Sequence, residues 1–212
     1  SWRVTPDAMR IRGLLNPEDA AKFDSSGRPT DPDLVRSRIP VPMFEIGNGE
    51  VGQSSVWFGD GMYTYSCLNG QGGYGDSRFI QRWAHTGGND RGEKIKSALG
   101  DAVKSARVSS AGLVEDFKTA TTVAVNDVFA LLDQWGRKAG LMTAEQARRA
   151  TEASRDDTSY PGRNLANVLS GITLAAQDET DLAVQRKLEQ AATRIMQRGL
   201  RYLDGIELVA QA

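Results

Sequence analysis

The sequence predicts an α+β protein, with an N-terminal antiparallel sheet built from hairpins and a C-terminal bundle of amphipathic helices. Two observations predict this class. Up to about residue 88, short runs of β-branched and aromatic residues lie between glycine and proline breakers. Beyond that point, apolar residues recur at helical spacing, as at Leu113, Phe117 and Ala120. We therefore divide the chain into a strand- and turn-rich part, 1–88, and a helical part, 89–212, and expect one cooperative domain.

The N-terminal part is predicted to open with two short helices. Thr5-Pro6-Asp7 offers a hydroxyl cap, a proline that needs no N–H and an acid in the first turn, and predicts a helix through Leu15. Asn16-Pro17 repeats this signal and predicts a second helix to Phe23. A turn-rich segment follows to residue 42, with a short edge strand expected within 34–39.

The sheet itself is predicted to begin at residues 43–46. That strand enters an Asn48-Gly49 turn, a dipeptide that favours tight hairpins because both residues accept positive φ. Further strands are expected at 55–58, 61–68 and 77–86. The glycine-rich stretch 69–75 is predicted to be a loop. It lacks the Gly-Lys-Ser/Thr ending of a phosphate-binding loop, so we reject a nucleotide-binding fold.

Helical spacing then extends through most of the remaining chain. It begins at 95–106 and continues over 113–135, which predicts a long helical region closed by glycines at 136 and 140. Thr143 and Gln146 form a capping box that opens a helix to Ser154. Two further helices are predicted over 164–177 and 180–204.

Composition excludes most catalytic and metal chemistry. Cys67 is the only cysteine and His85 the only histidine, which excludes an intrachain disulfide, a four-cysteine zinc site and any site that needs two histidines. We predict a non-enzymatic protein without a cofactor. No apolar run reaches the ~18 residues that span a bilayer, so no membrane contact is expected and the cytoplasm is the expected compartment. The chain begins at Ser1 without a signal-peptide pattern, and we expect functional residues upstream of it.

The densest positive charge lies in residues 78–107, although the whole chain has a net charge of −1. This segment holds seven basic residues against three acidic ones, or +4. Cations beside aromatic rings suit single-stranded nucleic acid, because cations bind phosphates and ring faces stack on bases. The alternative is a solvated helix face beside core aromatic residues. The candidate nucleic-acid-binding residues are Tyr63, Tyr65, Arg78, Arg82, Trp83, His85, Arg91, Lys94 and Lys96.

Several motifs, in order, resemble a known family. They are FEIGNGEVG at 44–52, MYTYSCLNG at 62–70, RWAHTG at 82–87, and LANVLSGITLAAQD at 165–178 continuing into LEQAA at 188–192. Together, over roughly residues 40 to 200, they resemble the phage/plasmid-like protein family catalogued as domain of unknown function 932. The chain departs from that pattern at Gly49, where serine is common, and at 169–172, where Asn-Ala-Leu is common. The resemblance implies a mobile-element protein without an assigned activity.

Two functional hypotheses are consistent with these features. The first is a single-stranded DNA-binding protein, since a hairpin sheet followed by helices is similar to the phage annealing proteins that assemble as rings or helices on DNA. The second is a structural or self-assembling interaction protein of a phage or host-takeover complex, suggested by long amphipathic helices and the lack of catalytic clusters. Both hypotheses include a homo-oligomer.

Overall fold

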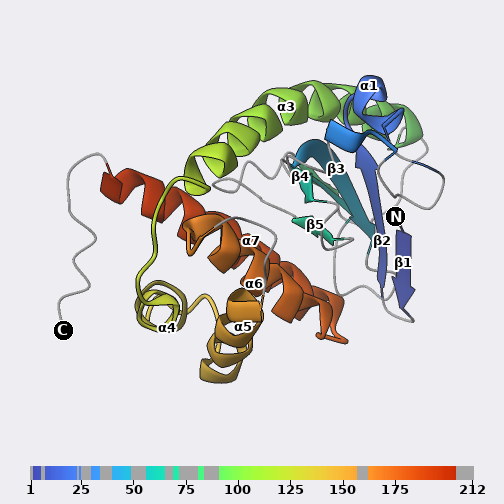
Figure 1. Ribbon diagram of the computed structural model, residues 1–212. Coiled ribbons are helices and arrows are strands. Elements are labelled where there is room, and N and C mark those ends of the chain that lie inside the picture. The colour runs from blue at the N-terminus through green and yellow to red at the C-terminus, as the bar shows by residue number, and fades with distance from the viewer. Residues whose placement is uncertain are drawn as a thin grey trace.

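The chain folds into an N-terminal antiparallel sheet followed by C-terminal helices, which confirms the predicted α+β class (Figure 1). Long helix α3 arches over the sheet, and the remaining helices pack together beyond it. This computed structural model describes residues 2–5, 8–22, 24, 30–33, 40–48, 56–64, 69–71, 81–83, 91–156 and 162–203. The edge strand predicted within 34–39 lies outside the described residues.

Six described strands form one antiparallel sheet: β1 (Trp2–Thr5), β2 (Ala8–Leu14), β3 (Val41–Asn48), β4 (Val56–Thr64), β5 (Asn69–Gln71) and β6 (Gln81–Trp83). The first four lie side by side in chain order. The outer edge of β4 is shared, because β5 pairs with residues 62–64 and β6 with residues 56–58. The segment that holds Arg82 and Trp83 therefore lies at an edge of the sheet.

The first predicted helix is wrong. Residues 2–5 and 8–14 form the antiparallel strand pair β1–β2, in which Thr5 pairs with Ala8. The sequence of β2 alternates apolar Met9 and Ile11 with charged Arg10 and Arg12, a period of two that is typical of a strand and outweighs the capping signal at Thr5. The second predicted helix is confirmed as the short α1 (Pro17–Ala20).

The sheet differs from the prediction in three further places. The strands expected at 55–58 and 61–68 are one strand through Thr64, because Gly59 and Gly61 stay paired with β3. Gly47 pairs with Trp57, so β3 and β4 are joined by more than a two-residue Asn48-Gly49 turn. The predicted loop at 69–75 begins as strand β5.

Five described α-helices and one π-helical turn form the C-terminal part: α3 (Arg91–Ala120), α4 (Val128–Leu131), the π-helical turn Leu132–Arg137, α5 (Ala144–Asp156), α6 (Leu165–Gln177) and α7 (Leu182–Leu203). The capping box at the start of α5 is confirmed, since Thr143 N donates to Gln146 Oε1 at 2.9 Å and Gln146 N donates to Thr143 Oγ1 at 3.2 Å. None of these described helices is both long and apolar enough to cross a bilayer.

The helical region predicted over 113–135 is interrupted after Ala120. The hydroxyls of Thr121 and Thr122 donate to the carbonyls of Lys118 and Thr119 at 2.7 and 2.8 Å, which satisfies the last turn of α3. The next residues form a bridge to the start of α6: Val125 N donates to the carbonyl oxygen of Arg163 at 3.1 Å, and Leu165 N donates to that of Val123 at 2.8 Å.

The largest hydrophobic core joins the sheet to the helices. Met62 of β4 packs in the same cluster as Phe117 of α3 and the buried faces of α6 and α7. A second, smaller cluster lies under the first half of α3, where Phe58 and Ala106 are fully buried and Phe58 stacks on Phe44 with ring centroids 5.8 Å apart. Helix α3 is therefore held against the sheet along much of its length, with its opposite side exposed.

A carboxylate at the end of α6 ties the α6–α7 turn to α5. Glu179 accepts a hydrogen bond from Gln146 Nε2 at 3.1 Å and pairs with Arg149. The Gln146 amide and the Arg149 guanidinium lower the pKa of Glu179 below its ordinary value of 4.5. The ionised form is thus the one that the fold stabilises.

We expect Glu179→Gln to lower the free energy of unfolding by about 1 kcal/mol at neutral pH. A carboxyl whose pKa is depressed in the folded state stabilises the fold above its unfolded pKa and loses that effect as pH falls through its folded pKa. The difference between wild type and variant should therefore shrink as pH falls below 4.5. Urea titrations at a series of pH values measure it, and a difference that is constant with pH would contradict the assignment.

Candidate nucleic-acid interface

The predicted interface residues are distributed over β4, β6 and α3. Tyr65, Arg78 and His85 lie outside the described residues. Tyr63 lies in β4, where it pairs with Val41 and Gly70. Arg82 and Trp83 are adjacent in β6, opposite Trp57 and Val56 of β4. Arg91, Lys94 and Lys96 lie in the first two turns of α3.

The three basic candidates of α3 do not share one side of the helix. Residues two apart in an α-helix are separated by about 200° around its axis. Lys94 and Lys96 therefore occupy nearly opposite sides, whereas Arg91 and Lys94, three apart, lie on the same side. Lys96 is exposed to solvent.

Lys96 belongs instead to a row of basic residues along the exposed side of α3, which we call the basic row. Lys96, Arg107 and Lys118 follow one another at intervals of 11 residues, which places successive members only about 20° apart. Lys104 lies about 80° from Lys96 and belongs to the same arc. All four are exposed, and the row spans 22 residues, or about 33 Å.

Acidic positions of α3 lie within this arc and along one edge of it, since Glu93 is about 60° from Lys96. Asp101 and Glu115 are displaced from Lys96 by about 140° and 100°. The Lys104 ammonium is 4.0 Å from the Asp101 carboxylate, with both side chains more than 75% exposed, and the Lys118 ammonium is 2.6 Å from Glu115. Exposed pairs of this kind are weak. Asp116 lies off the row, and partial burial raises the pKa of its carboxyl.

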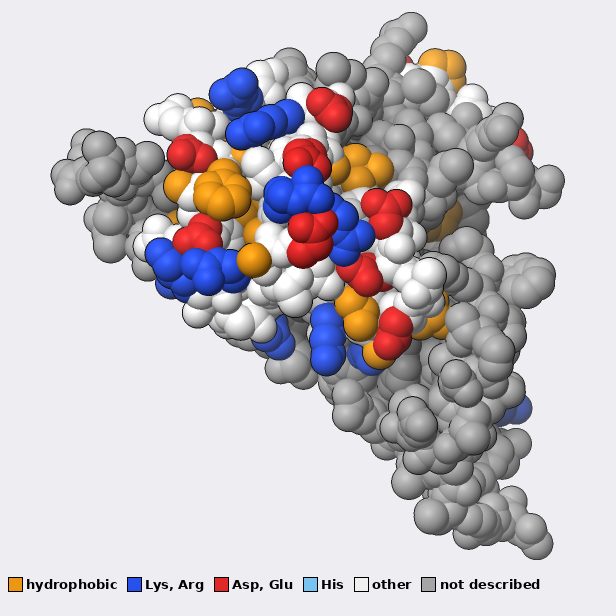
Figure 2. Space-filling model, turned by 90° about the horizontal axis from the view of Figure 1, so that it is seen from below, with side chains coloured by type: hydrophobic (Ala, Val, Ile, Leu, Met, Phe, Trp, Pro, Cys, Tyr) orange, Lys and Arg blue, Asp and Glu red, His pale blue; other side chains and the backbone are white. Residues whose placement is uncertain are grey.

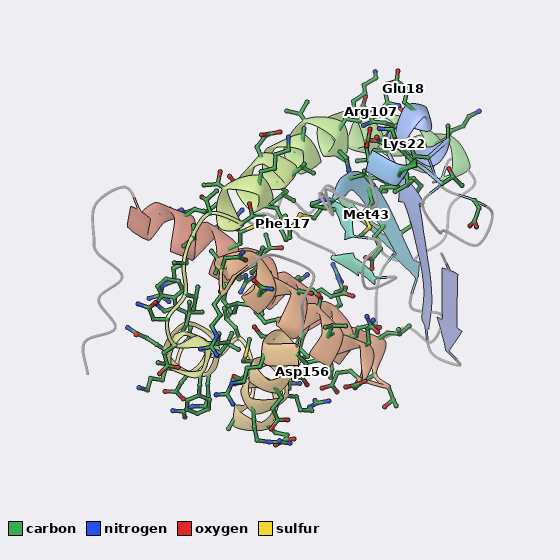
Figure 3. All side chains as sticks on the ribbon, viewed as in Figure 1. Glu18, Lys22, Met43, Arg107, Phe117 and Asp156 are labelled. Carbon is green, nitrogen blue, oxygen red and sulfur yellow. The ribbon has the colours of Figure 1, made fainter. Side chains whose placement is uncertain are left out.

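Arg107 has a structural contact as well. Its Nε and Nη2 donate to the carbonyl oxygen of Leu15 at 3.3 and 3.2 Å, which fastens the end of β2 to α3. Figure 3 shows Arg107 where α3 passes α1, near Glu18 and Lys22. The guanidinium is thus fixed in the middle of the row, and its charge remains at the exposed surface.

The surface around α4 and α5 carries both signs of charge. Viewed from the side of α4 and α5, Lys and Arg side chains are interspersed with Asp and Glu (Figure 2). On α5, for example, Arg148 pairs with both Glu145 and Glu152 at 2.6 and 2.5 Å. Helix α3 carries six basic residues against four acidic ones, and α7 carries five against one. On α3, four of the basic residues lie in one arc of the exposed side.

The sequence alone indicates part of this row. The charged segment 78–107 includes Lys104 and Arg107, but Lys118 lies beyond its end. The whole row can be recognised from its spacing of 11 residues, which is close to three helical turns. That spacing places the residues on one side only because 91–120 is one continuous helix.

We also searched the described part of the chain for a metal site. Within it, no three His, Cys, Asp or Glu side chains come close enough together to hold a metal ion. Comparison with protein-family models, with curated proteins and with solved structures finds no match to this chain. The resemblance to domain of unknown function 932 therefore stays a prediction, and the interface rests on geometry alone.

Proposed function

We propose that this protein binds single-stranded DNA along the basic row of α3, as a non-enzymatic protein of a phage or plasmid. The observation that carries this proposal is the alignment of Lys96, Lys104, Arg107 and Lys118 on the exposed side of one helix. Ammonium and guanidinium groups in line neutralise successive phosphates of a strand that lies along the helix. The edge strand β6 holds Arg82 and Trp83 and precedes α3 in the chain, and tryptophan is a residue type whose ring stacks on bases.

The exposed position of the row suits a backbone contact. Non-specific binding to single strands depends on counterion release, and it needs cations that reach phosphates without losing other partners. Lys96 and Lys104 meet this condition best, because the pair that Lys104 makes is loose and exposed, whereas Arg107 also holds Leu15. We therefore assign these two lysines the largest share of the electrostatic affinity.

The double variant Lys96→Gln/Lys104→Gln tests this assignment. Each phosphate contact on a single strand contributes about 0.7 to the slope of log affinity against log salt, so the variant should lower that slope by about 1.4. Fluorescence anisotropy of a labelled oligothymidylate, between about 50 and 300 mM salt, measures it. The matched control is Lys187→Gln/Arg194→Gln, which removes two exposed charges from α7.

The proposal fails if wild type shows no salt-dependent binding, or if the control lowers the slope as much as the α3 variant. Light scattering with and without the oligonucleotide separates the two functional hypotheses. Oligomers that form only on DNA are expected here. A stable assembly that is indifferent to DNA would favour a self-assembling interaction protein instead.

A further inference from the structure

A polar cavity of about 310 Å³ lies among the helices, at the start of α4, the end of α5 and the start of α6. None of its described lining residues belongs to α3 or to the sheet. The cavity is therefore separate from the basic row. The lining residues that matter are Asp127, Ser154, Arg155, Arg163, Asn164 and Asn167.

The cavity wall is built by contacts between distant segments. The bridge between 123–125 and 163–165 holds Arg163 beside the residues that lead into α4. On the other side, Asn164 and Asn167 form a capping box: Asn167 N donates to Asn164 Oδ1 at 3.1 Å and Asn164 N donates to Asn167 Oδ1 at 3.3 Å. Both asparagines are buried, so this end of α6 is rigidly placed.

The charges of the lining favour an anion. Arg155 and Arg163 supply two guanidinium groups, and in the described part of the chain neither makes an ion pair. The amino end of α6, a helix of 13 residues, adds partial positive charge. Asp127 is the acidic residue of the described lining, and its Oδ1 already accepts the hydrogen bond of Ala130 N at 2.9 Å.

One buried hydroxyl at this wall lacks a partner among the described residues. Ser154 is 6% exposed, and its Oγ is buried without a hydrogen bond to any of them. The backbone N and the Cβ of Ser154 lie close to Gly171 of α6, so this residue fixes the contact between α5 and α6 behind the cavity wall. The groups that can reach a ligand are the two arginines, which come from separate segments and line the same space.

We propose that this cavity binds a phosphate group between Arg155 and Arg163. Guanidinium forks bind phosphate oxygens in pairs, and a tetrahedral group can accept hydrogen bonds from both arginines at once. A volume of about 310 Å³ is larger than phosphate alone needs and leaves room for the organic group of a phosphate ester. A small phosphomonoester and a phosphodiester of nucleic acid offer the same chemistry.

The test is a titration of the full chain followed by ¹H–¹⁵N NMR at constant ionic strength, with inorganic phosphate, thymidine monophosphate and an oligothymidylate without terminal phosphates. We expect saturable shifts of the Nε–H signals of Arg155 and Arg163 and of the Gly162 amide, with a dissociation constant on the order of millimolar for phosphate. Tighter binding of the monophosphate identifies a small ester as the ligand, and tighter binding of the oligonucleotide identifies nucleic acid.

Variants make the assignment specific. Arg155→Gln and Arg163→Gln should each weaken phosphate binding about tenfold, the usual effect of one charge-assisted hydrogen bond, and Arg194→Gln on α7 should leave it unchanged. Asp127→Asn should strengthen it a few-fold, because asparagine caps a helix as well as aspartate does but removes the negative charge. Absence of saturable shifts at tens of millimolar phosphate, or arginine variants that bind as wild type does, would overturn the proposal.

Discussion

Replacing Phe117 by alanine is expected to lower the free energy of unfolding by about 4 kcal/mol. Phe117 is fully buried on the inner side of α3, and its cluster includes Met62 of the sheet together with α6 and α7. Figure 3 shows it projecting from α3 toward these helices. Removing the ring leaves a cavity at the place where the sheet meets the helices. Both parts of the chain therefore lose packing contacts.

This variant also tests the expectation of one cooperative domain. If the sheet and the helices unfold together, urea titrations of Phe117→Ala should show one shifted transition by both circular dichroism and tryptophan fluorescence. The control Phe117→Leu keeps most of the volume and should cost markedly less. Two separated transitions, with only one of them shifted, would show that the two parts unfold independently.

The second large effect is expected at the contact between α5 and α6. A Cβ atom on Gly171 of α6 would lie 2.4 Å from the carbonyl oxygen of Ala150 and 2.7 Å from Cβ of Ser154. The first of these is a backbone atom of α5, which cannot move without shifting the helix. Gly171→Ala is therefore expected to lower the free energy of unfolding by about 3 kcal/mol, the upper part of the range for overpacked cores.

The matched control is the same substitution on α3. A Cβ on Gly112 would meet no atom of the described residues within 4 Å, and the residue is exposed. Gly112→Ala should therefore stabilise the protein by about 0.5–1 kcal/mol through helix propensity and the unfolded chain. Chemical denaturation of the two variants measures both effects. If Gly171→Ala were neutral or stabilising, the close approach of α5 and α6 would be wrong.

Local signals predict where α5 and α6 begin. The capping box at Thr143 and the cap at Asn164 operate within four residues, so the sequence alone places the starts of α5 and α6. The interruption after Ala120 cannot be predicted in this way. It depends on a bridge to residues about 40 positions later, whose pairing no local pattern reveals.

Strands are harder to predict because local signals conflict there. At Thr5-Pro6-Asp7 the capping pattern competes with the alternation of β2, and pairing with β3 along residues 9–14 favours the strand. In β4, two glycines suggest a break, but the ladder with β3 continues through both of them. Of the candidate site, the sequence locates the charged segment, and only the continuous helix α3 reveals which of its cations share one side.

The most direct test of the central claim is to locate the DNA contact residue by residue. Oligothymidylate added to ¹⁵N-labelled protein should shift the amides of Lys96, Lys104, Arg107 and Lys118 together, as one row on α3. Their shifts should diminish as salt rises from about 50 to 300 mM. Shifts confined to α5, α6 or α7, or no shifts at low salt, would contradict a DNA-binding role for the basic row.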